Sequence, residues 1–320
     1  MWFWFAIIAL LCWSGSDLFS KIGCQHEDDK LSHLKMVMAV GLVMGIHAAY
    51  EIFFNHVEFN GQVLLTYLPV SALYILSMAI GYLGLRYIEL SISSPICNSS
   101  GAIVAILTIA LVGLRDLVPA QLIATALVCL GVIGLGVVEA REDEALRLAR
   151  QEAGNRRYAK SALAIILPVV YCLLDALGTF ADSLVLFDDA YPDETTFRLL
   201  FWNGSKLAED SANVAYELTF LAVGLVCFVY VVLIRRSRLV PKREGPKYVG
   251  AIFETIGQFF YISALADSDH VALSAPIISA YCVVSVLWSR IFLKEKLSWK
   301  HYAMIALVVI GIVILGVYDG

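Results

Sequence analysis

The chain has 320 residues, of which 60% are apolar and 16% are charged, and its mean hydropathy is +0.78. A water-soluble domain is about 45–50% apolar and about 25% charged, so this composition excludes a single aqueous fold and predicts that lipid surrounds most of the chain. The formal net charge is −5, and the basic residues form short clusters between apolar runs, which argues against a nucleic-acid partner.

Ten apolar runs are long enough to cross a bilayer, which takes roughly 20 residues in a helix. Backbone groups in lipid must be hydrogen-bonded within the protein, so each run is expected to be helical. The first run starts at Met1 without a positive segment before it, which favours a transmembrane helix over a signal peptide. In chain order, helices one to ten are predicted at residues 2–20, 36–54, 63–85, 92–114, 117–138, 162–187, 214–234, 248–265, 271–293 and 302–318.

Most connections between these runs are short, as in a bundle of antiparallel neighbours. Two are longer. Residues 141–160 are rich in charge, and we interpret them as a cytoplasmic linker with a short helix at the membrane surface. Residues 188–211 form the longest loop, which is acidic at its start.

The positions of the basic residues predict the orientation, because cytoplasmic connections carry an excess of positive charge. All but three of the 23 Lys and Arg residues lie in the connections after helices one, three, five, seven and nine or at the adjoining helix ends. The three on the opposite side are Arg115, Arg198 and Lys206. Both termini are therefore predicted outside, and we expect the membrane to be a bacterial plasma (inner) membrane.

The chain contains an internal repeat. The segment SSPI at residues 93–96 recurs as SAPI at residues 274–277, which is 181 positions later, and AVGLV at residues 39–43 recurs at residues 222–226. We predict a first five-helix repeat at residues 1–140 and a second at residues 161–320, joined by the linker at 141–160. Because five is odd, the second repeat enters the membrane with the opposite sense, an arrangement typical of secondary transporters with a site between the halves.

Residues 261–315 carry a more specific pattern. They read YISALADSDHVALSAPIISAYCVVSVLWSRIFLKEKLSWKHYAMIALVVIGIVIL, with Ser-Ala-Pro in helix nine and a Leu-Lys-Glu-Lys turn before helix ten. This stretch resembles the second EamA repeat of the drug/metabolite transporter superfamily, and residues 93–119 echo it more weakly. The resemblance implies a ten-helix fold, a central cavity lined mainly by helices one, three, four, six, eight and nine, and transport by alternating access. It implies no particular substrate, because members of that family carry very different metabolites.

Two predicted spans carry an acid one turn after an aromatic residue. Trp13 precedes Asp17 in helix one, and Tyr171 precedes Asp175 in helix six. Residues four apart share a helix face. An ionisable residue inside a span costs about 2.5–3.5 kcal/mol on insertion scales and is a functional candidate by default. A carboxylate beside a ring suits an organic cation, and in a partly dry cavity it could also exchange a proton.

The alternative for Asp17 and Asp175 is structural, with bonds to helix backbones or to Lys21 that hold the bundle together. Helix one is predicted to run inward and helix six outward, which puts both rings near the midplane and the carboxylates on opposite sides of it. An inverted repeat should give this arrangement, so we favour a functional role.

Glu254 and Gln258, one turn apart in helix eight, are also predicted to line the substrate site. Their counterparts at the 181-residue spacing are Leu73 and Ser77, so the carboxylate is present in one half only. Such asymmetry suits substrate selection better than maintenance of the fold.

Polar residues in helix four must face protein or water. We predict that Asn98 contacts the substrate, because a buried amide needs partners. For Ser99 and Ser100 we favour a role in close helix packing.

Several other polar residues are given structural interpretations. For His47 and Glu51, one turn apart in helix two, a local hydrogen bond is favoured over a proton relay or a metal site. Asp182 and Glu217 lie near the outer ends of their spans and are predicted at the interface or in a vestibule. The seven cysteines include no CxxC pair and mostly lie in apolar runs, so we interpret them as small core residues.

The sequence therefore predicts a secondary transporter that moves a small polar metabolite, such as an organic cation, an amine or an amino acid, by alternating access, with proton coupling as an option. The alternatives are a membrane-embedded lipid-modifying enzyme and a non-transporting sensor or scaffold. The acids straddle the midplane instead of clustering at one interface, and no nucleotide-binding loop is recognisable, so we predict no enzymatic activity, cofactor or metal. The expected partners are the substrate and the lipid bilayer, and a monomer and a homodimer both stay open.

Overall fold

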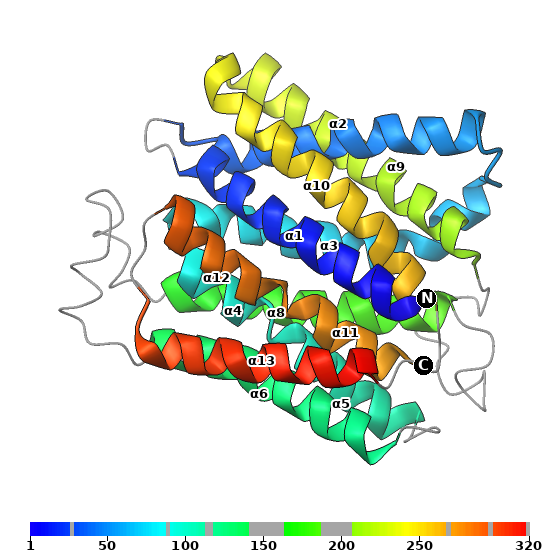
Figure 1. The fold of residues 1–320 in the computed structure, drawn as a ribbon. Coiled ribbons are helices and arrows are strands. Elements are labelled where there is room, and N and C mark those ends of the chain that lie inside the picture. Colours follow the sequence, from blue (N-terminus) through cyan, green and yellow to red (C-terminus); the bar gives the residue numbers. More distant parts are fainter. Residues whose placement is uncertain are drawn as a thin grey trace.

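The computed structural model describes residues 1–25, 29–87, 90–112, 118–140, 163–186, 207–266, 270–293 and 297–317. Within these ranges the helices run side by side, and both chain termini lie at the same end of the bundle (Figure 1). The predicted linker at residues 141–160 lies outside the described part of the chain. The helices are α1 (Trp2–Cys24), α2 (Ser32–Phe53), α3 (Gly61–Tyr87), α4 (Leu90–Cys97), α5 (Ser100–Val112), α6 (Pro119–Ala140), α8 (Leu163–Leu186), α9 (Glu209–Phe228), the π-helical η2 (Val229–Ile234), α10 (Pro241–Leu265), α11 (Val271–Ser279), α12 (Tyr281–Phe292) and α13 (Trp299–Val317).

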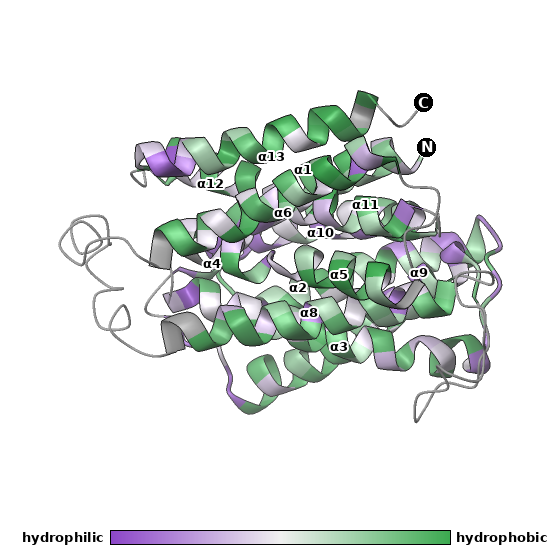
Figure 2. Ribbon diagram, turned by 90° about the horizontal axis from the view of Figure 1, so that it is seen from below, coloured by the Kyte–Doolittle hydropathy of each residue, from purple (hydrophilic) through white to green (hydrophobic). Residues whose placement is uncertain are grey.

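These helices have the length and composition of membrane spans. Among the described residues, nine are long and apolar enough to cross a bilayer, when α4 with α5, α9 with η2, and α11 with α12 are counted as single spans. The tenth, α13, has a shorter apolar part at Trp299–Leu315. Apolar ribbon predominates along the sides of the bundle, and hydrophilic segments gather toward its ends (Figure 2). The predicted all-α membrane fold is confirmed.

Spans four and nine are broken, whereas the sequence analysis predicted continuous helices. α4 gives way to α5 at residues 98–99, and α11 gives way to α12 at Ala280. Pro95 lies inside α4, and Pro276 lies inside α11. The two prolines are equivalent positions of the repeat, and each break follows its proline within four residues. A proline alone does not account for a break, because Pro69 and Pro168 lie inside the continuous helices α3 and α8.

The principal helix contacts join one half of the chain to the other. α1 packs along α10 and α3 along α8, while α2 packs along α9 and α6 along α13 (Figure 1). If the helices of the first half are matched in order with those of the second, exchanging the halves converts the α1–α10 contact into the α8–α3 contact. The other two contacts map onto themselves. This is the contact pattern of two inverted repeats.

The α2–α9 contact is made at equivalent glycines. A Cβ atom added to Gly41 would lie 2.7 Å from the carbonyl oxygen of Phe220 and 3.1 Å from the Cα atom of Gly224. A Cβ atom added to Gly224 would lie 3.2 Å from the Cα atom of Gly41. The two helices therefore touch through their backbones, which small residues allow.

The α6–α13 contact repeats this design. A Cβ atom added to Gly131 would lie 2.9 Å from the carbonyl oxygen of Met304, and one added to Gly311 would lie 2.7 Å from that of Ala124. Gly131 and Gly311 are equivalent in the repeat, and so are Ala124 and Met304. Gly131 and Gly311 therefore contact equivalent residues of the opposite helix, as a twofold relation between the halves requires.

The turns after α2 and η2 also match. His56 has a φ of 55° and Arg236 has a φ of 50°. In each turn the N–H of the next residue hydrogen-bonds to the carbonyl oxygen six residues earlier, at 3.1 Å after His56 and 2.9 Å after Arg236. A residue in the left-handed region thus ends the span at the same place in both halves.

α10 begins at Pro241, well before the apolar run that the sequence analysis predicted. Its first turns were missed because they are charged. The charges are paired inside the protein, with Lys35 Nζ 2.8 Å from Asp29 Oδ2 and 3.4 Å from Glu244 Oε1. Lys247 Nζ lies 2.8 Å from Glu244 Oε2. This ion-pair network lies at the end of the bundle opposite the chain termini and connects the helices there.

Candidate functional site

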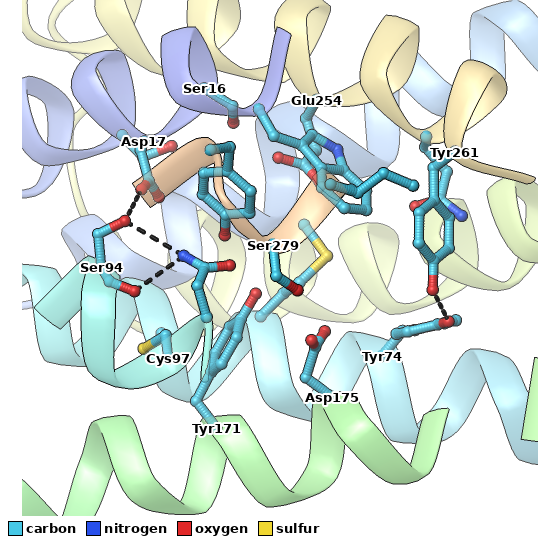
Figure 3. A pocket seen from close by; sticks show the side chains of 18 of the residues that line it. Ser16, Asp17, Tyr74, Ser94, Cys97, Tyr171, Asp175, Glu254, Tyr261 and Ser279 are labelled. Atoms are coloured by element: carbon cyan, nitrogen blue, oxygen red, sulfur yellow. Dashed lines mark hydrogen bonds between the residues drawn. The ribbon is translucent and has the colours of Figure 1, made fainter. Parts of the chain in front are cut away.

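A cavity lies in the middle of the bundle, where α1, α3, α8, α9, α10 and both broken spans meet. Its volume is about 60 Å³, measured as the space open to the centres of water molecules. Figure 3 shows side chains from the two halves pointing into it. All seven residues predicted for the substrate site line this cavity, namely Trp13, Asp17, Asn98, Tyr171, Asp175, Glu254 and Gln258.

The Asp17 carboxylate is held by hydroxyl groups from both halves. Its Oδ2 atom accepts hydrogen bonds from Ser94 Oγ at 2.6 Å and from Ser285 Oγ at 2.8 Å. Lys21, considered above as a partner for Asp17, donates instead to the carbonyl oxygen of Leu85 at 3.0 Å. The carboxylate is thus oriented by neutral donors, and its charge stays available to a ligand.

Asp175 is held in the same way from α5. Its Oδ2 atom accepts a hydrogen bond from Ser100 Oγ at 2.7 Å. Ser100 lies just after the break in span four, so the break brings its hydroxyl group to the carboxylate. The sequence analysis favoured a packing role for Ser100, whereas the structure gives it an orienting hydrogen bond.

The two rings that precede these acids are each seated on a glycine of a partner helix. A Cβ atom added to Gly81 of α3 would lie 2.8 Å from the Tyr171 ring, and one added to Gly257 of α10 would lie 2.7 Å from Trp13 Nε1. The Trp13 ring also lies 4.8 Å from that of Tyr261, centroid to centroid. Glycine at both places lets the rings approach the partner backbone closely.

Glu254 and Gln258 enter the cavity from α10. The Ser16 side chain of α1 lies beside the Glu254 carboxyl group, which also interacts electrostatically with Asp17 and Asp175 (Figure 3). Gln258 is 3% exposed, and its Nε2 atom has no hydrogen-bond partner among the described residues. This buried donor is therefore free to bind a ligand.

Two further buried polar atoms share that property. Trp13 Nε1 and the Tyr82 hydroxyl have no hydrogen-bond partner within the described ranges, and both residues line the cavity. A buried polar group without a partner costs about 1–3 kcal/mol. Three unpartnered groups around one cavity indicate a place that a polar ligand or water fills.

Asn98 lies in the break between α4 and α5. Its Nδ2 atom donates to the Ser94 carbonyl oxygen at 2.8 Å and to Ser94 Oγ at 3.2 Å. Since Ser94 in turn donates to Asp17, the amide of Asn98 supports the orientation of that carboxylate, and Asn98 itself lines the cavity.

The side chains that line the cavity favour a positively charged ligand. Three acids and seven aromatic side chains surround the cavity, and the lining residues in the described part of the chain include no Lys, Arg or His. A positive charge among aromatic faces gains cation–π stabilisation of about 0.5–2 kcal/mol in addition to its attraction to carboxylates. The site therefore has the chemistry of a cation-binding pocket.

Five tyrosines of the lining were not predicted from the sequence. Carboxylates, amides and rings one turn before an acid are candidates by their chemistry, whereas a tyrosine elsewhere in an apolar span has no such neighbour. A search for any hydroxyl-bearing ring within a predicted span would have found them. They are Tyr74, Tyr82, Tyr216, Tyr261 and Tyr281.

Asp182 and Glu217 are not vestibule residues, contrary to the prediction. Both are 0% exposed. Asp182 accepts a hydrogen bond from the Tyr67 hydroxyl at 2.7 Å. Glu217 Oε1 lies 2.8 Å from His47 Nδ1, and His47 Nε2 lies 3.4 Å from Glu51 Oε1. The predicted local pair of His47 and Glu51 is thus part of a three-residue cluster between α2 and α9.

Comparison with known proteins supports the family resemblance. Residues 204–317 match the family model described as EamA-like transporter family. The second half of this chain is EamA-like. The match confirms the resemblance drawn from residues 261–315 and is consistent with a drug/metabolite transporter superfamily member. The match to a transporter family and the apolar helices of membrane length together support an integral membrane protein.

One solved structure, described only as the crystal structure of a protein, resembles the EamA-like chain over nearly its whole length. The match has a TM-score of 0.59 at 13% identity and covers 98% of this chain and 96% of that chain. At this identity the likeness concerns the fold alone. No curated protein sequence matches this chain significantly.

Proposed function

We propose that this EamA-like protein is a secondary transporter that moves a small organic cation, amine or amino acid across the membrane by alternating access. The observation that carries the proposal is the lining of the cavity, in which Asp17, Asp175 and Glu254 meet seven aromatic side chains without a cationic residue among them. Such a lining attracts a quaternary or protonated amine and repels an anion.

The unpartnered groups refine the substrate class. Trp13 Nε1, Gln258 Nε2 and the Tyr82 hydroxyl are suited to an oxygen atom on the same ligand. An amino alcohol or an amino acid carries both an ammonium group and such an oxygen.

Alternating access is supported by the internal symmetry. The four principal helix contacts are related by exchange of the halves, and both broken spans lie at the cavity. In inverted-repeat transporters, broken helices line the site, and one unit moves against the other around it. Coupling to a proton gradient is the second part of the proposal.

Transport in proteoliposomes tests the proposal. We would compare radiolabelled tetramethylammonium, choline and glycine betaine, which share one cationic head and differ in carrying no oxygen, a hydroxyl or a carboxylate, with succinate as an anionic control. Uptake of at least one of the three, and none of succinate, is expected. Folded protein that moves none of them, with or without an imposed pH gradient, would refute the function.

The orientation is proposed from the charge distribution, with both termini outside in a bacterial plasma membrane. Glu58 is exposed at the end of the bundle that holds the termini, and Arg235 is exposed at the other end. A maleimide that cannot cross the membrane should label Glu58→Cys in intact cells and Arg235→Cys only after lysis. The parent protein, whose seven cysteines are buried or half-buried, provides the blank, and the reverse labelling pattern would overturn the orientation.

A further inference from the structure

Asp182 is a buried acid that the cation site does not use. Its side chain is 0% exposed, and it does not line the cavity. It lies on α8 seven residues, or about two turns, after Asp175, so both acids are on the same helix face about 10 Å apart along the axis. α8 runs toward the end of the bundle that holds the termini, and Asp182 therefore lies between the cavity and that end.

A chain of hydroxyl groups joins Asp182 to the cavity. The Tyr74 hydroxyl lies 3.4 Å from Asp182 Oδ2 and 2.5 Å from the Tyr261 hydroxyl, which in turn lies 2.8 Å from Thr179 Oγ1. Tyr74, Tyr261 and Thr179 all line the cavity, and Figure 3 shows the contact between the two tyrosines. The chain begins at the cavity and ends on the buried carboxylate.

The direction of these hydrogen bonds depends on the charge of Asp182. Each tyrosine hydroxyl carries one hydrogen and can donate only once. When Asp182 is ionised, Tyr261 donates to Tyr74, and Tyr74 donates to the carboxylate. When Asp182 is protonated, it donates to Tyr74, Tyr74 donates to Tyr261, and Tyr261 donates to Thr179. The bond from Tyr261 to Thr179 is made in the protonated state, and in the ionised state Tyr261 donates to Tyr74 instead. The chain reverses its direction by rotation of its hydroxyl hydrogens, without moving a heavy atom.

The groups around Asp182 leave its charge without a cationic partner. α3 contributes Tyr67 and Tyr74, and α10 contributes Tyr261. α8 itself carries Asp175, α4 carries Cys97, and α5 carries no titratable side chain. Among the described residues, no Lys, Arg or His is paired with Asp182. A buried carboxylate without a cation is held less strongly in its charged form, which makes proton binding favourable.

We propose that Asp182 is the binding site of the coupling proton and that Tyr74 and Tyr261 carry this proton between the cavity and Asp182. In uptake, Tyr261 receives a proton from cavity water and passes its own hydrogen to Tyr74. Tyr74 passes its hydrogen to Asp182, so both hydroxyls end neutral and the carboxylate ends protonated. The inference rests on the proposed transport function and locates the proton apart from the carboxylates that hold the cation.

A sodium ion is a poorer occupant of this place. The Tyr67 hydroxyl contacts Asp182 Oδ1 directly at 2.7 Å, and the tyrosines contact each other directly. These contacts leave no gap for an ion between the oxygens. A sodium gradient therefore serves as a control in the experiment.

The test uses the full-length protein in liposomes that contain a pH-sensitive dye, with choline as the probe. Two readings are taken, exchange of radiolabelled for unlabelled choline without a pH gradient, and accumulation of choline driven by a pH gradient together with proton movement. In Asp182→Asn, exchange should persist, because Asp182 lies outside the cavity, while pH-driven accumulation and proton movement should be lost. Asp182→Glu should restore both.

Ser183→Ala is the matched control. Ser183 is the buried neighbour of Asp182, and its hydroxyl bonds only to its own helix, at the Phe180 carbonyl oxygen 2.7 Å away. This variant should behave like the wild type. Choline exchange also reports that each variant is folded.

The outcomes separate the two proposals. If the wild type exchanges none of the probe cations, the transport function fails and this inference fails with it. If the wild type exchanges choline but is driven by a sodium gradient or by no ion gradient, only the proton site is overturned. Retention of pH-driven accumulation in Asp182→Asn also overturns the proton site alone.

Tyr67→Phe provides a second variant in case Asp182→Asn does not fold. It removes a donor to the charged carboxylate from outside the cavity. The charged form is then less favourable, so the pH at which half of the pH-driven accumulation remains should rise. An unchanged pH profile, with choline exchange intact, would contradict the role of Asp182.

Discussion

α1 and α8 occupy equivalent places in the two halves, and each carries an aromatic ring one turn before an aspartate, but the two helices differ two turns further along. Seven residues after Asp17 stands Cys24, a buried thiol, whereas seven residues after Asp175 stands Asp182. α3 and α10 differ in a similar way, since Glu254 of α10 corresponds to Leu73. The ring and aspartate pairs present in both halves line the cavity. Of the two acids present in one half only, Glu254 also lines the cavity, and Asp182 lies outside it.

This contrast separates two kinds of residue. Substitutions of residues that repeat are expected to have effects of similar size in the two halves, because each residue has a counterpart in an equivalent environment. Those that do not repeat can distinguish one substrate or one direction of movement from another. The four predictions below test this division, in order of decreasing effect.

The strongest test is removal of the repeated acids. Asp17→Asn and Asp175→Asn should each weaken the binding of tetramethylammonium about 10- to 100-fold, or about 1.4–2.8 kcal/mol, because each removes a charge that faces the ligand. The two losses should be similar if the site is symmetric. Dissociation constants from competition binding measure them, and Asp210→Asn, an exposed acid at the end of the bundle, is the control. Unchanged affinity in both variants would place the ligand elsewhere.

The repeated glycines should matter for stability in the same paired way. Gly131→Ala and Gly311→Ala each push a methyl group against the partner backbone, which should destabilise the fold by about 1–3 kcal/mol. Thermal unfolding in detergent, followed by tryptophan fluorescence, measures the effect. Gly245→Ala has open space around it and should leave stability equal or higher. A large loss at one glycine and none at the other would argue against the twofold relation.

The unrepeated acid should control selectivity. Glu254→Gln should reduce the preference for tetramethylammonium over glycine betaine about tenfold, or about 1.4 kcal/mol, because it removes a charge that repels the carboxylate of the zwitterion. The ratio of the two dissociation constants is the measurement. If Glu254→Gln weakens both ligands equally, Glu254 acts as a third general acid of the site and not as a selector.

The smallest effect is expected from the rings. Trp13→Phe should weaken tetramethylammonium binding about two- to fivefold, since the cation–π contribution is largest for tryptophan and is worth about 0.5–1 kcal/mol at modest exposure. Tyr171→Phe should change it less, because the aromatic face is kept. Trp4→Phe alters a tryptophan that is 62% exposed on the outside of the bundle and should have no effect. A Trp13→Phe variant that binds as tightly as the parent would show that the indole ring adds nothing to the binding that a phenyl ring does not supply.

The helices and the acids of the cavity could be predicted from sequence because both depend on local rules. The cost of placing charge in lipid singled out Asp17, Asp175 and Glu254, and the helical period placed Trp13 and Tyr171 beside two of them. The two broken spans could not be predicted in this way, because hydropathy averages over a break and an internal proline is not a sufficient signal, as Pro69 and Pro168 in continuous helices show.

The missed features depend on contacts between distant segments. Asp182 and Glu217 were assigned to the vestibule from their distance to a helix end, yet buried partners from other helices enclose them. The start of α10 was missed because Glu244 and Lys247 are residue types expected in water, while in the fold Glu244 pairs with both Lys247 and Lys35. No single-sequence rule reveals such partners.

The pairing of helices from the first half with helices from the second half has a consequence for folding during translation. α1, α2, α3 and α6 leave the ribosome before their principal partners, α10, α9, α8 and α13, have been made. During that interval the first half has backbone-lined surfaces without neighbours, and Asp17 lacks the hydroxyl group of Ser285. Late, long-range pairing slows folding and exposes intermediates to quality control. The first half made alone should be degraded, whereas the two halves made as separate chains should protect each other.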